Sequence, residues 1–245
     1  MSGHSKWANI KHQKGKVDAI RGKVTTKIGR EITIAVRLGG ADLTGNMRLK
    51  LAMQKAKANN IPKENIQRAI QKGQGSLAGA NYEEIVYEGY GPAGVAVMIE
   101  ILTDNRNRTA ADVRHLFSKY GGNLGESGCV SWMFKHKGLF VVETGGISEE
   151  DLMMLVIEAG AEDMKVEEDA FEIITAPDDF DAVQQALEDQ KIVPVIAEIT
   201  MIPETIAELN DADSEKMIKL LEILEEHDDV QNVYSNFEAP EEPME

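Results

Sequence analysis

Apolar side chains recur at helical spacing through the N-terminal part of the chain. Residues 16–38 place six of them on one face of a helix, at about 100° of turn per residue. These six are Val17, Ile20, Val24, Ile28, Ile32 and Ala35. A second helix is predicted at 46–59, and a third begins near Pro62, whose ring suits a first helical turn. Residues 1–15 show no apolar periodicity and are interpreted as an extended arm.

From residue 82 onward, the apolar positions favour short strands that alternate with helices. Two strands, 82–88 and 94–102, are joined by a turn at Gly91–Pro92. A helix at 107–120 and a strand at 129–134 follow. This part of the chain is therefore predicted to be an α/β sandwich.

Residues 139–201 follow the order strand, helix, strand, strand, helix, strand, which ends with a strand at 192–201. This is the ferredoxin-like order. A further helix carries apolar residues at i, i+3, i+4 and i+7, namely Met217, Leu220, Leu221 and Leu224. With a last strand at 231–237, this helix completes the 82–134 part only if the ferredoxin-like part is inserted into it.

The predicted fold class is α+β, with an N-terminal three-helix basic domain followed by two ferredoxin-like α/β sandwich domains, one inserted in the other. The predicted boundaries are 1–76 for the basic helical domain with its arm, 77–134 plus 203–238 for the discontinuous α/β domain, 135–202 for the inserted domain, and 239–245 for a tail.

Charge is distributed very unevenly along the chain, and this bears on what the protein binds. The net charge is −16, but residues 1–75 hold sixteen Lys and Arg against four Asp and Glu, a net +12. Residues 138–245 hold four bases against thirty-one acids, a net −27. A polyanion is attracted by the first segment and repelled by the second. The acidic segment is explained equally well by solubility alone.

Five cations form a stripe opposite the apolar face of the first helix, and no acid interrupts them: Lys16, Lys23, Lys27, Arg30 and Arg37. Like charges three or four residues apart destabilise a helix by a few tenths of a kcal/mol per pair. The stripe therefore indicates contact with phosphates, and the alternative is a solvated lysine face.

Further candidate nucleic-acid contacts lie on either side of this helix: Lys6, Trp7, Lys11 and Lys14 in the arm, Lys50 and Lys57 on the second helix, and Arg106 and Arg108 at a strand-to-helix junction. Trp7 is suited to stacking on a base. The two arginines can join helix-terminal N–H groups in binding an anion. For Lys50 and Lys57 the alternative is that their aliphatic stems cover a buried apolar seam. For Arg106 and Arg108 the alternative is a capped helix start with solvated arginines.

Catalytic and metal chemistry have little support in the sequence. Cys129 and His115 are the only plausible thiol–imidazole pair, and His4 and His12 have no other ligands near them in sequence. No enzyme activity, metal or cofactor is predicted. The longest apolar stretch, 94–102, is too short to span a bilayer, and no signal peptide is visible, so no membrane partner and a cytoplasmic location are expected.

Several long motifs closely resemble the YebC/PmpR family. They are SGHSKWANIKHQKGK at the start, GREI at 29–32, NIPKENIQRAIQKG at 60–73, YEGYGPAGVAV at 87–97 and NRNRTAADVRH at 105–115. The resemblance covers essentially the whole chain and implies a three-domain architecture. Two positions depart from the pattern: Leu43 stands where a proline is expected, and Cys129 where another small residue is usual.

The resemblance implies a DNA-binding transcriptional regulator, although mitochondrial relatives are translational activators and a ribosomal role is attributed to bacterial members. The expected function is therefore non-enzymatic, nucleic-acid-binding regulation of gene expression, with DNA-binding transcriptional regulation first. A factor that binds ribosomal RNA or the ribosome is the alternative, and an acidic protein–protein interaction module is the second alternative. Nothing in these residues separates duplex DNA from ribosomal RNA or fixes the oligomeric state.

Overall fold

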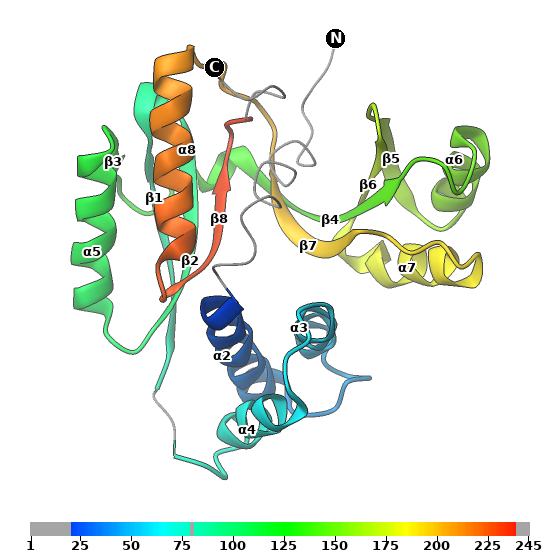
Figure 1. Cartoon of the computed structure of the whole chain (residues 1–245), viewed down its shortest axis with the longest axis horizontal. Coiled ribbons are helices and arrows are strands. Elements are labelled where there is room, and N and C mark those ends of the chain that lie inside the picture. The colour runs from blue at the N-terminus through cyan, green and yellow to red at the C-terminus, as the bar shows by residue number, and fades with distance from the viewer. Residues whose placement is uncertain (1–20, 79–80, 239–245) are drawn as a thin grey trace. The chain divides into compact units, whose positions relative to one another are not determined.

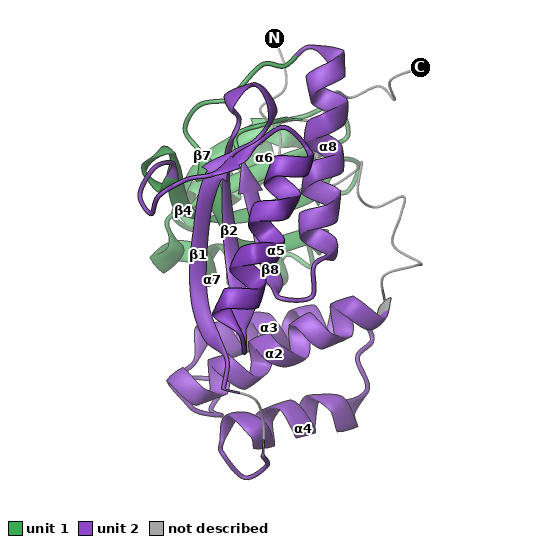
Figure 2. Ribbon diagram, turned by 90° about the vertical axis from the view of Figure 1, so that its left-hand side faces the viewer, with its two compact units in different colours: residues 1–15, 131–209, 236–245 green, residues 16–130, 210–235 purple. Residues whose placement is uncertain are grey.

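The structure is a computed structural model that describes residues 21–78 and 81–238. The chain divides into two compact units, coloured separately in Figure 2. Unit 1 contains residues 131–209 and the described residues from 236 onward, and unit 2 contains the described residues up to 130 together with 210–235. No helix among the described residues is long and apolar enough to cross a membrane.

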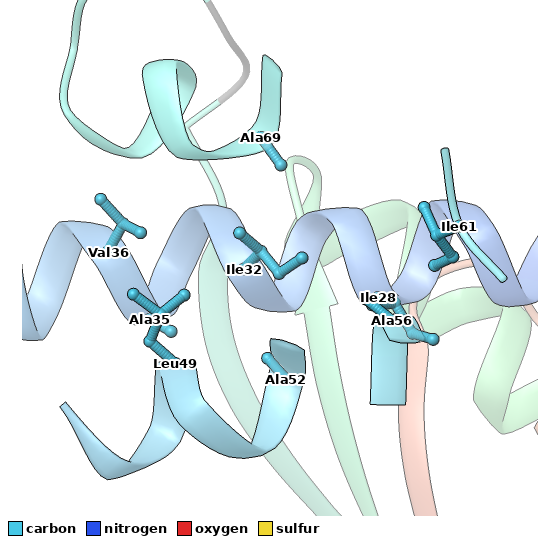
Figure 3. Packing of buried hydrophobic residues seen from close by; sticks show 9 residues of the cluster. All are labelled: Ile28, Ile32, Ala35, Val36, Leu49, Ala52, Ala56, Ile61 and Ala69. Carbon is cyan, nitrogen blue, oxygen red and sulfur yellow. The ribbon is translucent and has the colours of Figure 1, made fainter. Parts of the chain in front are cut away.

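The N-terminal part of unit 2 is a bundle of three helices, α2 (Arg21–Gly39), α3 (Met47–Ala58) and α4 (Lys63–Gly73). Helix α2 lies in the middle, with Ala69 of α4 on one side and Leu49 of α3 on the other (Figure 3). Asn46 joins α2 to α3, because its side chain accepts from the Leu49 amide at 3.0 Å and donates to the Ala35 carbonyl at 2.8 Å. This confirms the predicted helical region over the residues that are described.

The remainder of unit 2 is a four-stranded antiparallel sheet in the order β3-β1-β2-β8. Its strands are β1 (Glu83–Tyr90), β2 (Ala96–Thr103), β3 (Asn123–Leu124) and β8 (Val230–Ser235), and a short 3-10 turn, η2 (Pro92–Gly94), joins β1 to β2. Helices α5 (Arg106–Lys119) and α8 (Asp211–Glu226) cover one face of this sheet (Figure 1). Strand β8 pairs with β2, so the last strand completes a sheet begun by residues far earlier in the chain.

Unit 1 contains the second antiparallel sheet, in the order β5-β6-β4-β7. Its strands are β4 (Phe134–Glu143), β5 (Ala161–Val166), β6 (Ala170–Thr175) and β7 (Ile196–Pro203). Two helices, α6 (Glu149–Glu158) and α7 (Phe180–Asp189), connect them. The element order and strand order are those of a ferredoxin-like fold. Phe140 of β4 stacks on Phe180 of α7 with ring centroids 4.4 Å apart, which fastens helix to sheet.

The strand predicted at 129–134 is wrong. The chain runs as a loop and a 3-10 turn, η3 (Ser131–Met133), and only Phe134 begins a strand. The cause is a buried carboxylate, Glu88, which accepts hydrogen bonds from the amides of Gly128 and Val130 at 2.7 and 2.8 Å. Gly128 has φ +89°, which an L side chain rarely adopts. A side chain, not a neighbouring strand, therefore satisfies these backbone donors.

One predicted strand also begins later than expected, and one observed strand was not predicted. The strand expected at 192–201 begins only at Ile196, because Pro194 has no N–H to give to a ladder. The two-residue strand β3 pairs with β1 and was not predicted. The predicted three-way division of the chain into domains stays a prediction.

Two glycines of unit 1, Gly138 and Gly146, provide a test of its packing. A Cβ at Gly138 would lie 2.7 Å from Cδ2 of Phe180 and would also collide with Oγ1 of Thr175, whereas a Cβ at Gly146 meets nothing within 4 Å. Gly138→Ala is therefore expected to lower the free energy of unfolding by about 1–3 kcal/mol, as overpacking does. Gly146→Ala is the control and should change it by less than about 0.5 kcal/mol. Urea titration measures both, and equal midpoints for the two variants would contradict this packing.

Candidate nucleic-acid interface

The predicted contacts in the arm, Lys6, Trp7, Lys11 and Lys14, and the first stripe residue, Lys16, lie outside the described residues. Their role in binding stays a prediction. The described part of the predicted interface therefore begins with Lys23.

Three stripe cations on α2 meet the C-terminal end of α8. Lys23 Nζ donates to the Glu226 carbonyl at 3.0 Å, and Lys27 Nζ donates to the Glu225 carbonyl. Arg30 donates to the Asp228 carbonyl at 2.8 Å, one turn further along α2. The last carbonyls of a helix lack intrahelical partners and carry partial negative charge. This part of the stripe thus cancels the negative end of a helix within unit 2.

Lys27 is partly withdrawn from solvent. Burial lowers the pKa of its ammonium from 10.5 to about 8, against the opposing pull of Glu225 and Asp228. At neutral pH the side chain is still mostly charged, and its hydrogen-bond partner is a protein carbonyl. Lys23 keeps about half of its side chain exposed, at 47%. Of these two lysines, Lys23 is therefore the better placed to reach a phosphate while unit 2 keeps this arrangement.

A buried carboxylate, Asp229, lies directly after this helix end. Its residue surface is 3% exposed, and it accepts hydrogen bonds from four side chains on three elements. Those donors are Arg30 at 2.9 Å, Arg108 at 2.7 Å, Thr109 at 2.7 Å and Thr103 at 3.1 Å. Asp229 thereby joins the basic helix α2 to β2 and α5.

Two opposed effects set the pKa of Asp229. Burial alone raises it, but the hydrogen bonds from Arg108, Thr109, Arg30 and Thr103 outweigh burial and hold the pKa at about 2. The carboxylate is therefore ionised at every pH at which the protein would normally be studied. A buried charge is tolerated only when it is paired and fully hydrogen-bonded, as it is here.

The two arginines predicted at the strand-to-helix junction have different surroundings. Arg108 is committed to Asp229 and to Asp104, the latter at 3.1 Å. Arg106 is exposed in the first turn of α5. Asn105 caps this helix by accepting from the Arg108 amide at 3.1 Å, so one terminal N–H already has a partner. Anion binding by this pair stays a prediction, which the geometry favours for Arg106 more than for Arg108.

The exposed cations of the bundle lie elsewhere. Arg37 at the end of α2 and Lys57 at the end of α3 are exposed, and neither forms an ion pair with a described residue. Lys50 is half-buried and has an interaction of its own. Lys63 and Arg68 on α4 are exposed too, although they were not among the contacts predicted from the sequence. The net charge of the segment could have pointed to these two residues, because residues 21–76 hold twelve cations and three acids.

Arg48 is a cation with a structural role. Its guanidinium bonds Glu31 of α2 at 2.6 Å and Glu84 of β1 at 2.5 Å. Burial lowers its pKa, but these two carboxylates outweigh that effect and raise the pKa above its usual value. It also occupies Glu31, one of the three acids of the segment. The field around the exposed cations is thereby left with little opposing charge.

The predicted absence of catalysis stays a prediction, and the surroundings of Cys129 agree with it. Burial and, after it, the charge of Glu88 raise the pKa of the Cys129 thiol. A raised pKa disfavours the thiolate, which is the nucleophilic form. Among the described residues, no group of three or more His, Cys, Asp or Glu side chains could hold a metal ion.

Comparisons with known proteins agree along the whole chain. Residues 5–76 match the model of the TACO1/YebC protein N-terminal domain, and residues 82–237 match that of the TACO1/YebC second and third domain. A protein from Pelotomaculum thermopropionicum named "Probable transcriptional regulatory protein" is 60% identical over 97% of this chain and 99% of its own length. A protein of the same name from Carboxydothermus hydrogenoformans is 56% identical over 97% and 99%.

A crystal structure of similar fold also exists. It is described as a conserved hypothetical protein from Aquifex aeolicus and is 50% identical, with a TM-score of 0.86. The match covers 98% of this chain and 100% of that one.

The Asp229 cluster yields a pH-dependent prediction. Because its pKa falls from 3.8 to about 2 on folding, the charge contributes about 2 kcal/mol of stability. This contribution is complete above pH 3.8 and is lost as the pH falls through about 2. Asp229→Asn should therefore lower the free energy of unfolding by about 2 kcal/mol at pH 7, and by progressively less below about pH 4.

Urea titrations across this pH range provide the measurement. Asp228→Asn is the matched control, since the Asp228 side chain is exposed and the hydrogen bond to Arg30 comes from its backbone carbonyl, which the substitution keeps. The interpretation fails if the two variants lose the same stability, or if the loss in Asp229→Asn does not depend on pH.

Proposed function

Because the chain belongs to the TACO1/YebC family, we propose that it regulates gene expression by binding nucleic acid through its N-terminal basic segment. Duplex DNA is the first candidate target, since close relatives are named probable transcriptional regulatory proteins. The protein acts in the cytoplasm and without catalysis. The arm cations and Trp7 extend the contact surface beyond the helical bundle.

The observation that supports this proposal most strongly is the net positive charge of the bundle. Residues 21–76 carry a net +9, and Glu31, one of their three acids, is already bound to Arg48. Exposed cations that form no ion pair with any described residue lie on each of its three helices, at Arg37, Lys57 and Arg68. Lysine and arginine side chains that neutralise phosphates release counterions, and this supplies most of the sequence-independent affinity for nucleic acid.

Within this proposal, the α2 cations that face α8 have a positioning role. Lys23, Lys27 and Arg30 hold the bundle against the end of α8 in unit 2 and present its other surfaces to solvent. Binding through phosphates requires a fixed orientation of the basic surface, which a rigid attachment provides. Base-specific readout is not part of the proposal.

Ribosomal RNA is the second candidate target, and the acidity of unit 1 favours it. Residues 131–209 hold nineteen acids and four bases, a net −15. On bare DNA this charge is only repulsive. On a ribosome, basic proteins lie between the RNA surfaces and can accommodate an acidic domain. The alternative to nucleic-acid binding is an acidic protein–protein interaction module.

A charge-reversal variant tests the proposal. Arg37→Glu, Lys57→Glu and Arg68→Glu together are expected to weaken binding by about a hundredfold or more and to reduce the salt slope by about 2.7, which is about 0.9 for each lost phosphate contact. The control variant is Lys135→Glu, Lys191→Glu and Lys219→Glu, which changes the net charge equally outside the bundle. Band shifts of duplex DNA and sedimentation with ribosomes from a nuclease-treated lysate, at two salt concentrations, measure both variants.

The outcomes separate the candidates. Duplex DNA binding that the bundle variant loses and the control keeps supports transcriptional regulation. Salt-sensitive sedimentation with ribosomes, lost in the same variant, supports the ribosomal target. If neither assay detects binding, or if both variants bind equally, nucleic-acid binding by the bundle is refuted and the interaction module is favoured.

A further inference from the structure

Helix α6 in unit 1 exposes apolar side chains on the side that faces away from the sheet. Its sequence is EEDLMMLVIE, and Leu152 and Val156 are completely buried against unit 1. Met154 is 65% exposed, Ile157 is 48% exposed and Met153 is 39% exposed. Residues three and four apart are neighbours on a helix surface, so these three form one apolar strip. We name Met153, Met154 and Ile157 the α6 strip.

This exposure is specific to α6 among the helices that cover the two sheets. Helices α5, α7 and α8 contribute no large exposed hydrophobic side chain. Helix α7, the partner of α6 on the same sheet, has Asp181, Gln185 and Glu188 on its outer side. A helix that is apolar on both sides is normally covered on both sides. The α6 strip is therefore a surface that a partner is expected to cover.

The surroundings of the strip carry negative charge. Glu149, Glu150 and Asp151 form the first turn of α6, and Glu158 ends it. Glu150 and Glu158 lie within one helical turn of Met154 on the same side of the helix. The net −15 of residues 131–209 adds to this field. Apolar residues at the centre with charges at the rim are typical of a protein interaction surface.

We propose that the α6 strip is the docking site for a basic amphipathic helix of a partner protein. Apolar side chains of that helix pack on Met153, Met154 and Ile157, while its lysines and arginines face Glu150 and Glu158. Methionine is flexible and polarisable, so it adapts to partners of differing shape. This inference goes beyond the proposed function, because it concerns the acidic unit and involves no nucleic acid.

Charge selects this occupant over two others. A second copy of the chain that docked through the same surface would bring its own acidic α6 rim against this one, and like charges placed together oppose association. A membrane surface with anionic lipids would be repelled in the same way. A basic helix satisfies both the apolar centre and the acidic rim.

Titration of the full-length protein with a synthetic peptide tests the proposal. The probe is an 18-residue helix with leucine at i, i+3, i+4 and i+7 spacing and lysine elsewhere, and a scrambled peptide of the same composition is its control. The protein carries ¹³C-methyl label on its eleven methionines. The amphipathic peptide is expected to shift the Met153 and Met154 methyl signals saturably, and to bind at least about tenfold more tightly than the scrambled one.

Variants locate the site. Met153→Gln, Met154→Gln and Ile157→Gln together should weaken peptide binding by at least about tenfold and leave nucleic-acid binding unchanged. Asp181→Asn with Glu188→Gln on α7 is the control and should change peptide affinity by less than about threefold. Met154→Gln alone, at the most exposed position of the strip, gives a milder test if the triple variant does not fold.

Four results would overturn the proposal. The triple variant binds the peptide as tightly as the parent, or the scrambled peptide binds equally well. The Met153 and Met154 signals shift with protein concentration alone, which identifies a second copy as the occupant. Deleting residues 1–20 shifts these signals without any peptide, which identifies the chain's own basic segment as the occupant.

Discussion

The ion pair between Arg30 and the buried Asp229 is the contact on which the arrangement of unit 2 depends. A buried carboxylate without partners would cost several kcal/mol, so the four donors around Asp229 must be present together. Those donors come from α2, the end of β2 and the first turn of α5. One charge thus determines where the basic helix lies on the sheet. Lys23 and Lys27 of α2 extend the attachment by donating to carbonyls at the end of α8.

Two surfaces of opposite character follow from this attachment and from the composition. The bundle directs cations such as Arg37, Lys57 and Arg68 to solvent, while residues 131–209 are dominated by acids. A protein of this kind can engage a polyanion and a polycation at the same time without either competing for the same side chains. Regulation of gene expression suits such a division, because the nucleic acid and the machinery acting on it are different partners.

The repeat of apolar residues predicted most helices and strands, but it did not predict which other elements they contact. The helical face of Ile28 and Ile32 and the ferredoxin-like order of unit 1 could be predicted, because burial imposes a repeat on the sequence. The repeat does not tell what lies across from the predicted stripe, and for Lys27 this is a helix end. Asp229 and Glu88 gave no signal, since the donors of each come from residues distant in sequence.

The pairing of β8 with β2 has a consequence for synthesis on the ribosome. The four strands of unit 1 are contiguous in the chain, from Phe134 to Pro203, so its ferredoxin-like sheet can close while translation continues. The other sheet waits for Val230–Ser235, and Arg30 waits for Asp229 just before it. The basic helices are therefore synthesised well before the carboxylate that pairs with Arg30, so through that part of translation the nascent chain presents a strongly cationic segment to the RNA of the ribosome that makes it.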